Sequence, residues 1–279
     1  MMKQKYDTVS FDCSKITTKA YSTSFSSGIR FLKRHLHQPI YSIYAFVRFA
    51  DEIVDSFHDY NKAVLLSEFK EDTWKAIKNG ISTNPILNSF QHIVTKYGIE
   101  DILIERFFRS MEADLEQKNH SEISYEEYIY GSAEVVGLMC LRVFTENDDG
   151  LFRQLQMPAR RLGAAFQKVN FLRDMNADYL VLGRTYFPGV NFTSFSELEK
   201  EKIQVDIEAD FEQALMGIRK LPISSRRGVY LAYFYYKKLF LMIKSTPAEK
   251  TLNTRIRIPN HKKIGLMFQS MIRHQLNML

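Results

Sequence analysis

The amino-acid sequence predicts an all-α fold, with a single domain over residues 1–279. Apolar residues recur at intervals of three and four along most of the chain, which is the period of an amphipathic helix. The alternation typical of strands is confined to short runs such as Arg255–Ile258, which are too brief to build a sheet. Short loops marked by Asn79-Gly80 and Asn84-Pro85 separate the helical segments, and no change in composition indicates an interdomain linker.

The expected helices follow from this periodicity and from the turn residues between them. In chain order they are Cys13–Thr18, Ser24–Lys33, Gln38–Asp55, Tyr60–Lys78, Pro85–Tyr97, Ile102–Lys118, Tyr125–Thr145, Leu151–Asp178, Ser196–Ile218, Ser224–Lys244 and Asn260–Asn277.

The segment Tyr21–Ser27, YSTSFSS, joins the first two of these helices. Ser22 and Ser24 are two residues apart, so they do not share a helical face. They fit an extended segment or a helix N-terminus, where hydroxyl and free N–H groups together bind phosphate oxygens. Ordinary capping of the following helix explains the same pattern.

The helix Gln38–Asp55 carries polar residues on one face and apolar residues around it. The polar residues that share a narrow arc are Tyr44, Arg48, Asp51 and Asp55. Two carboxylates one turn apart repel each other and weaken an isolated helix, and a bound cation reverses the sign of that interaction.

Small residues interrupt the helix Tyr125–Thr145 at Gly131–Ala133 and at Gly137. Glycine inside a helix costs stability, so these positions indicate close packing against another helix or room for a long ligand. Tyr128 and Val136 lie nearby and suit the wall of a substrate-binding cavity.

The helix Leu151–Asp178 repeats the acidic design, and the rest of the chain is organised around it. The polar residues in about one quadrant of this helix are Gln167, Asn170, Asp174 and Asp178. Gly183 and Pro188 are expected to end the helix, and Arg184 and Tyr186 lie between them.

Two acidic pairs on facing helices predict a site for divalent cations. Mg²⁺ prefers oxygen ligands and usually retains water and substrate phosphates in its shell, so two such pairs suit a few Mg²⁺ ions with a diphosphate between them. We expect Mg²⁺, with Mn²⁺ as the alternative metal. Arg48, Arg173 and Arg184 lie next to the pairs and suit the anion, and Asn170 suits metal or phosphate. One such pair alone is most often a solvated face.

Composition excludes several other classes of protein. Cys13 and Cys140 are far apart and have no CxxC partner, so we expect a reduced, cytoplasmic protein without a disulfide scaffold or zinc site. The sequence has no GxGxxG or Walker-type loop, and its histidines do not cluster. The longest apolar run, Gly228–Ile243, is interrupted by Lys237 and Lys238, so no membrane-spanning helix is expected.

The net charge of +6 resides in the segment Lys250–Leu279, which contains no acidic residue, whereas the rest of the chain is neutral. The apolar residues of this segment have helical spacing. That pattern indicates a helix packed on the domain with a solvated basic side, or peripheral contact with an anionic membrane. No nucleic-acid-binding motif accompanies the charge, so nucleic acid is not an expected partner. The oligomeric state is open.

These motifs resemble those of the squalene and phytoene synthase family. YAFVRFADEIVD and QKVNFLRDMNADYLVLGRTYFP are similar to its two aspartate-rich motifs, and YSTSF and YIYGSAEVVG occur in the expected order. The resemblance extends over about residues 11–269. It implies the isoprenoid synthase fold, a helical bundle with a central cavity capped by the two acidic helices, and the head-to-head joining of two prenyl diphosphates.

The resemblance also implies a role for each matching residue. The metal ligands and catalytic carboxylates would be Asp51, Asp55, Asp174 and Asp178, with Asn170 as a further ligand. The phosphate-binding residues would be Ser22, Ser24, Arg48, Asn170, Arg173, Arg184 and Tyr186. The residues that line the cavity and shield carbocations would be Phe25, Tyr44, Tyr128, Val136, Gly137 and Gln167. The released diphosphate would act as a base, with help from Tyr186.

The motifs resemble most closely those of bacterial phytoene synthases. This implies carotenoid biosynthesis: two geranylgeranyl diphosphates would give phytoene through a cyclopropylmethyl diphosphate, without NADPH. A squalene or dehydrosqualene synthase that uses farnesyl diphosphate is the alternative. A non-catalytic assembly protein on the same fold is a third interpretation, and the retention of all four aspartates argues against it.

Overall fold

The computed structural model confirms the all-α fold and describes residues 2–116, 122–182, 185–190 and 195–258. Within these ranges no residue belongs to a β-strand. The helices are α1 (Met2–Tyr21), α2 (Thr23–Arg30), η1 (Arg34–Leu36), α3 (His37–Ser56), α4 (Lys62–Asn79), α5 (Pro85–Tyr97), α6 (Asp101–Glu116), α7 (Glu122–Ile129), η2 (Tyr130–Glu134), α8 (Val135–Phe144), α9 (Asp149–Ala177), η3 (Asp178–Leu182), α10 (Glu197–Ile218), α11 (Ile223–Lys244) and α12 (Ala248–Asn253). Of the short elements, η1 is a 3₁₀ helix, whereas η2 and η3 are π-helical.

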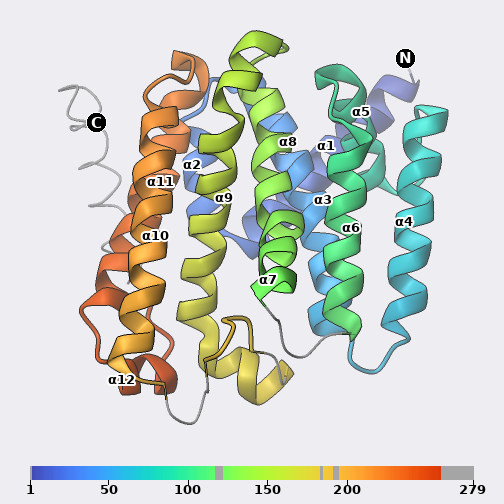
Figure 1. Cartoon of the computed structure of the whole chain (residues 1–279). Helices are drawn as coiled ribbons and strands as arrows, with labels where there is room; N and C mark the ends of the chain where they lie inside the picture. The colour runs from blue at the N-terminus through green and yellow to red at the C-terminus, as the bar shows by residue number, and fades with distance from the viewer. Residues whose placement is uncertain (1, 117–121, 183–184, 191–194, 259–279) are drawn as a thin grey trace.

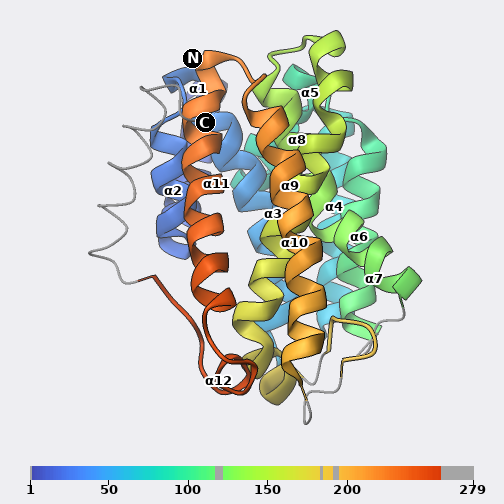
Figure 2. The ribbon, with the colours of Figure 1, turned by 60° about the vertical axis from the view of Figure 1, so that its left-hand side comes forward.

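The long helices lie roughly along one direction, with α9 near the middle (Figure 1). On one side α10 packs against α9, and on the other α8 does so. Helix α1 packs against α3 and α5, and α2 packs against α11, which Figure 2 shows at one side of the bundle. The two acidic helices, α3 and α9, are therefore both interior elements of the bundle.

An aromatic cluster fixes α3 against α5 and α6. The ring of Phe46 stacks on that of Phe90, with centroids 3.8 Å apart and planes inclined by 3°. Phe107 and Phe108 contact the same ring from α6, at 5.5 and 5.6 Å. These rings are fully buried, and aromatic pairs of this kind contribute about 0.5–1.5 kcal/mol beyond the burial of their area.

Helix α1 is much longer than the expected Cys13–Thr18. Its buried face consists of small polar residues, Ser10, Ser14 and Thr18, so it has no apolar stripe to reveal it. The Ser14 and Ser89 hydroxyls lie 2.6 Å apart across the contact with α5. The buried hydroxyls are thus hydrogen-bonded, which small residues in close contact allow.

The expected helix Tyr125–Thr145 is divided into α7, η2 and α8. Its glycines permit close approach of other backbones: a Cβ on Gly131 would lie 2.7 Å from the Arg106 carbonyl oxygen. On the facing helix α9, a Cβ on Gly163 would lie 2.6 Å from the Ala133 carbonyl oxygen. Close packing therefore accounts for the small residues around this π-helical turn.

The remaining boundaries that the structure describes agree with expectation to within a few residues. Helix α9 ends at Ala177, so Asp178 begins the π-helical turn η3 and does not end the α-helix. Helix α12 was not expected. The expected helix Asn260–Asn277 lies outside the described residues, so the single-domain organisation of residues 1–279 stays a prediction. No helix in the described part of the chain is long and apolar enough to cross a membrane.

Candidate active site

A cavity of about 640 Å³ lies among α2, α3, α8, α9 and α11. Most of the residues predicted to form the site line it. They are Ser22, Phe25, Tyr44, Arg48, Asp51, Asp55, Tyr128, Val136, Gly137, Gln167, Asn170, Arg173, Asp174, Asp178 and Tyr186. Ser24 is half-buried in α2 and is not among the lining residues, and Arg184 lies outside the described residues.

Ser22 is the N-cap of α2 and also lines the cavity. Its backbone is extended (φ −142°, ψ 108°), and its hydroxyl accepts a hydrogen bond from the Phe25 N–H at 3.1 Å. The capping interpretation of this segment is therefore correct for Ser22. Capping by Ser22 also places the N-terminus of α2 at the cavity wall. A helix N-terminus can bind phosphate, so the phosphate-binding interpretation is compatible with the structure.

The first acidic motif holds closely spaced, half-buried carboxyl groups. Burial and the neighbouring Asp55 carboxylate raise the pKa of Asp51 to about 7, and Arg48 only partly opposes them. Arg48 itself pairs with Glu52, and its guanidinium lies 4.5 Å from the centre of the Tyr21 ring. A carboxyl with a pKa raised in this way gains from any cation that enters the cavity.

The second acidic motif is paired with two arginines. Arg173 Nε donates to Asp174 Oδ1 at 3.1 Å, and Arg255 Nε lies 2.6 Å from the same oxygen. Arg255 follows α12 in the chain and also lines the cavity. Both arginines contact Asp174, and a guanidinium group can bind phosphate oxygens as well as carboxylate oxygens.

The acidic residues fit Mg²⁺ but do not form a complete cage. In the described part of the chain no three acidic, histidine or cysteine side chains lie close enough to hold a metal by themselves. Mg²⁺ commonly takes one or two carboxylates and completes its octahedron with water and substrate phosphates. The charge concentrated around Asp51 fits such an ion, and the role of the aspartates as metal ligands stays a prediction.

Aromatic rings form one wall of the cavity. Phe25 contacts Tyr44 at 5.6 Å and Phe166 at 6.2 Å, and Phe166 stacks on Tyr236 at 4.0 Å. The Tyr236 hydroxyl donates to Asn170 Oδ1 at 3.4 Å. The faces of such rings attract positive charge, because the ring quadrupole is negative above and below the plane.

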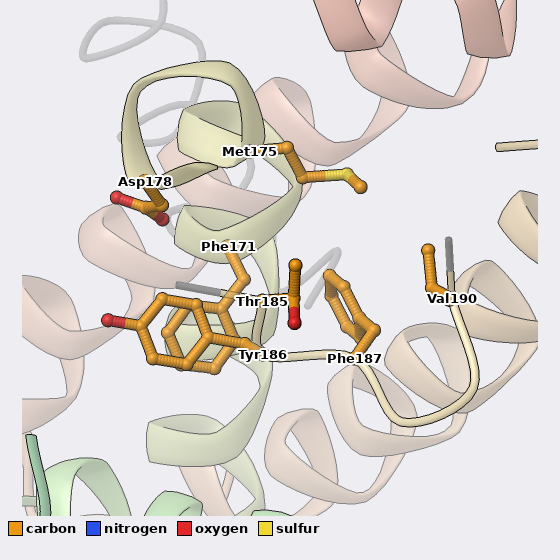
Figure 3. Close-up of a pocket in the computed structure, with 7 residues that line it drawn as sticks. All are labelled: Phe171, Met175, Asp178, Thr185, Tyr186, Phe187 and Val190. Atoms are coloured by element: carbon orange, nitrogen blue, oxygen red, sulfur yellow. The ribbon is translucent and has the colours of Figure 1, made fainter. Parts of the chain in front are cut away.

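Tyr186 closes the cavity beside the second acidic motif. Figure 3 shows its ring lying over that of Phe171, with Asp178 on the neighbouring turn. The ring centroids are 4.0 Å apart and the planes are inclined by 7°. A small adjoining space of about 20 Å³ is lined by this stack together with Phe187 and Val190, and the Phe187 ring meets Phe171 edge-on at 6.0 Å. The predicted roles of Tyr186 in phosphate binding and proton transfer stay untested by this geometry.

The opposite end of the cavity is apolar. Its lining includes Leu155 and Pro158 on α9, Gly217 on α10 and Leu221 after it. Leu155 and Asp174 are 19 positions apart on α9, which corresponds to about 28 Å along a helix. The cavity therefore joins a charged end to a long apolar end.

Sequence reasoning missed several polar residues of the cavity wall, among them Asp114, Tyr236 and Arg255. Asp114 lies seven positions after the buried Phe107, so helical periodicity places it on the buried face of α6. A carboxylate on the buried face of a helix was therefore the sequence feature that could have identified Asp114 as a site residue. Arg255 belongs to a short alternating run, and nothing in that run indicates which side chains face inward.

Comparison with known proteins identifies related sequences. A presqualene diphosphate synthase of Rhodopseudomonas palustris is 28% identical over 61% of this chain and 59% of its own length. A 4,4'-diapophytoene synthase of Staphylococcus haemolyticus is 27% identical over 69% of this chain and 67% of its own. A 15-cis-phytoene synthase of Synechococcus elongatus is 24% identical over 94% of this chain and 92% of its own.

Among solved structures, a ligand complex of a dehydrosqualene synthase superposes with a TM-score of 0.84. It covers 98% of both chains at 21% identity, and it confirms the isoprenoid synthase fold. The family model for squalene/phytoene synthase matches residues 18–262, which is most of the sequence. The chain therefore belongs to the squalene/phytoene synthase family.

Proposed function

We propose that this protein is a Mg²⁺-dependent prenyltransferase that condenses two geranylgeranyl diphosphates head to head into phytoene. The observation that carries the proposal is the single cavity with two aspartate motifs at one end and an apolar wall at the other. Such a cavity fits a substrate with a diphosphate head and a hydrocarbon tail.

The charged end binds the heads of the substrates. When bound, Mg²⁺ neutralises the negative charge that develops on the leaving diphosphate. Asp51 and Asp55 on α3, with Asp174 on α9 and Asp178 on η3, would hold that metal. Arg48, Arg173 and Arg255 bind phosphate oxygens, and so does the N-terminus of α2.

The aromatic and apolar walls act on the hydrocarbon chains. They exclude water, which would capture an allyl cation as an alcohol. The faces of Phe25, Tyr44 and Tyr236 stabilise the cation while the double bond of the second chain attacks it. Proton loss to the released diphosphate then closes the cyclopropane, and a second ionisation followed by proton loss yields the conjugated triene.

The preference for geranylgeranyl chains rests on the depth of the cavity. Its apolar end extends to Leu155, which is 19 positions before Asp174 on α9, or about 28 Å along the helix, and this length accommodates a long tail. The similarity to a 15-cis-phytoene synthase over 94% of the chain supports this choice. The alternative is a dehydrosqualene or squalene synthase that uses farnesyl diphosphate, and the similarity to a 4,4'-diapophytoene synthase favours it.

Product analysis separates these activities. The purified protein is incubated with Mg²⁺ and either farnesyl or geranylgeranyl diphosphate, with and without NADPH, and the hydrocarbons are identified by mass spectrometry. We expect phytoene from geranylgeranyl diphosphate and no effect of NADPH. A product from farnesyl diphosphate alone would establish the alternative, and no diphosphate release with either substrate would favour the non-catalytic assembly protein.

Contact with a membrane surface is a second part of the proposal. Phytoene is insoluble in water and must leave the enzyme for a lipid phase, and the segment Lys250–Leu279 is basic and contains spaced apolar residues. Most of this segment, residues 259–279, lies outside the described residues. We propose a protein of the cytoplasm that touches anionic lipid at its surface.

A further inference from the structure

A fifth carboxylate lines the cavity outside the two acidic motifs. Asp114 lies near the end of α6, and only 7% of its surface is exposed. It lines the same cavity as Asp51 and Asp55, and its charge is close enough to help raise the pKa of Asp51. The Tyr128 hydroxyl donates a hydrogen bond to Asp114 Oδ2 at 2.7 Å.

Tyr128 is held firmly in this arrangement. Its ring stacks against Tyr186 at 5.4 Å and against Phe171 at 6.0 Å, and 5% of its surface is exposed. Burial and the Asp114 carboxylate raise the pKa of Tyr128 well above its ordinary value, so the phenol keeps its proton. A phenol has one proton and also offers oxygen lone pairs. When the proton points to Asp114, the negative end of the O–H dipole points elsewhere.

We propose that Asp114 is a positioning residue that holds the Tyr128 hydroxyl with its oxygen, and not its proton, toward the hydrocarbon. This inference rests on the proposed function. A fixed oxygen dipole stabilises positive charge on the substrate chain where charge develops, and it costs no reorganisation at the moment of reaction. If the Tyr128 hydroxyl could rotate, its proton could point toward the substrate cation, and the stabilisation would be lost.

The proposed role predicts a loss in kcat with little change in KM. The dipole acts on charge that exists only after ionisation, whereas the diphosphate is bound at the other groups. Asp114→Leu and Tyr128→Phe should each lower kcat about 10- to 100-fold, the range for a hydrogen bond to a charged group. KM for the prenyl diphosphate should change less than about threefold.

A double-mutant cycle provides the decisive measurement. If Asp114 acts through Tyr128, the protein with both substitutions should be no slower than the slower single variant. Asp114→Asn keeps an acceptor oxygen and removes a buried charge, so it should fold, retain most of the wild-type kcat, and have no effect in the Tyr128→Phe protein. Product formation and thermal unfolding are measured on the same preparations.

Three outcomes would overturn the inference. Losses that multiply in the double variant would mean that Asp114 acts independently of Tyr128. A raised Mg²⁺ concentration for half-maximal rate in Asp114→Asn would make Asp114 a metal ligand. A wild-type protein that turns over no prenyl diphosphate would refute the proposed function as well, whereas the first two results would leave that function standing.

Discussion

The ionised carboxylate of Asp51 lowers the free energy of unfolding of the protein. Its pKa of about 7 exceeds the ordinary value of 3.8 because it is buried beside Asp55. The folded state therefore binds this proton more tightly than the unfolded state does. Between pH 4 and 7 the free energy of unfolding falls as pH rises, and the full penalty is present above pH 7. A shift of this size corresponds to roughly 2–4 kcal/mol.

Asp51→Asn should therefore stabilise the metal-free protein at pH 8 while abolishing most of its turnover. We expect a gain of about 1–3 kcal/mol in the free energy of unfolding, because the substitution removes charge but leaves a buried polar group. Thermal unfolding in EDTA measures the gain. The gain should be less than half as large at pH 5 and should vanish below about pH 4, where Asp51 is protonated in the unfolded state as well as in the folded state.

Asp72→Asn is a matched control for this substitution. Asp72 is exposed on α4 and pairs with Lys75, so its loss should change stability by less than about 0.5 kcal/mol at either pH. If Asp51→Asn changed the free energy of unfolding by the same amount at pH 8 and at pH 5, a raised pKa of Asp51 would be refuted.

At the scale of single elements, helices with local start and stop signals were predictable from sequence. The predicted range Pro85–Tyr97 coincides with α5. Asn84 Oδ1 accepts a hydrogen bond from the Ile86 N–H at 3.0 Å, and Gly98 ends the helix with φ 59°. Both signals lie within the segment itself, so no knowledge of the tertiary structure was needed.

The N-terminal helix and the π-helical turn were not predictable in the same way. Helix α1 buries Ser10, Ser14 and Thr18, and their burial depends on hydroxyl partners in other elements. The turn η2 depends on how closely α6 and α9 approach its backbone. Hydrophobic periodicity indicates neither the hydroxyl partners nor the close approach of other helices, because it depends only on which residues are apolar.

Gly163→Ala should test whether the close approach of α9 to η2 positions the residues of the cavity. The added Cβ would meet the Ala133 carbonyl oxygen at 2.6 Å and its carbonyl carbon at 3.0 Å, and backbone atoms cannot rotate away. Alanine favours the helix by up to about 1 kcal/mol. The contact should outweigh that gain and lower the free energy of unfolding by about 1–3 kcal/mol. Chemical denaturation measures the difference.

The same substitution should lower kcat, because α9 carries both Gln167 and Asn170 on the cavity wall. Gln154→Ala provides the control on this helix, since Gln154 is exposed and its replacement adds no contact. A Gly163→Ala protein as stable and active as the wild type would show that η2 and α9 can separate without consequence.

For the whole molecule, the sequence identified most of the polar residues of the cavity wall and missed those that only the assembled bundle brings there. The four motif aspartates were found through spacing and family resemblance. Asp114, Tyr236 and Arg255 come from three separate segments and meet the cavity only after the helices pack. None of the three belongs to a motif of chemically similar residues at helical spacing, so their positions on the cavity wall depend on long-range contacts.

The basic segment leads to a prediction about where the protein acts. Replacement of Lys262 and Lys263 by glutamine should weaken binding to vesicles that contain phosphatidylserine by about tenfold or more, because each lysine near such a surface contributes about 1 kcal/mol. Co-sedimentation at constant salt measures the binding. The matched replacements of Lys75 and Lys78, which are exposed on α4, should have a smaller effect. Equal effects would refute a specific role for the segment.

Binding of metal and diphosphate together should stabilise the whole bundle. The aspartate motifs belong to α3 and to α9 with η3, so a Mg²⁺–diphosphate unit held by both links elements that the chain connects only at a distance. At one hundred times the dissociation constant, ligation adds about 2.7 kcal/mol to the free energy of unfolding. We expect Tm to rise by roughly 5–10 °C with Mg²⁺ and inorganic diphosphate together, and by much less with either alone.

Asp51→Asn and Asp174→Asn should each abolish most of this joint rise, whereas Asp72→Asn should retain it. Loss in both motif variants would indicate one site that spans the cavity, since neither helix could then hold the unit by itself. If only one variant lost the rise, the diphosphate would be held on one side of the cavity. An equal rise in all the proteins would place the ligands elsewhere and remove the physical basis of the proposed reaction.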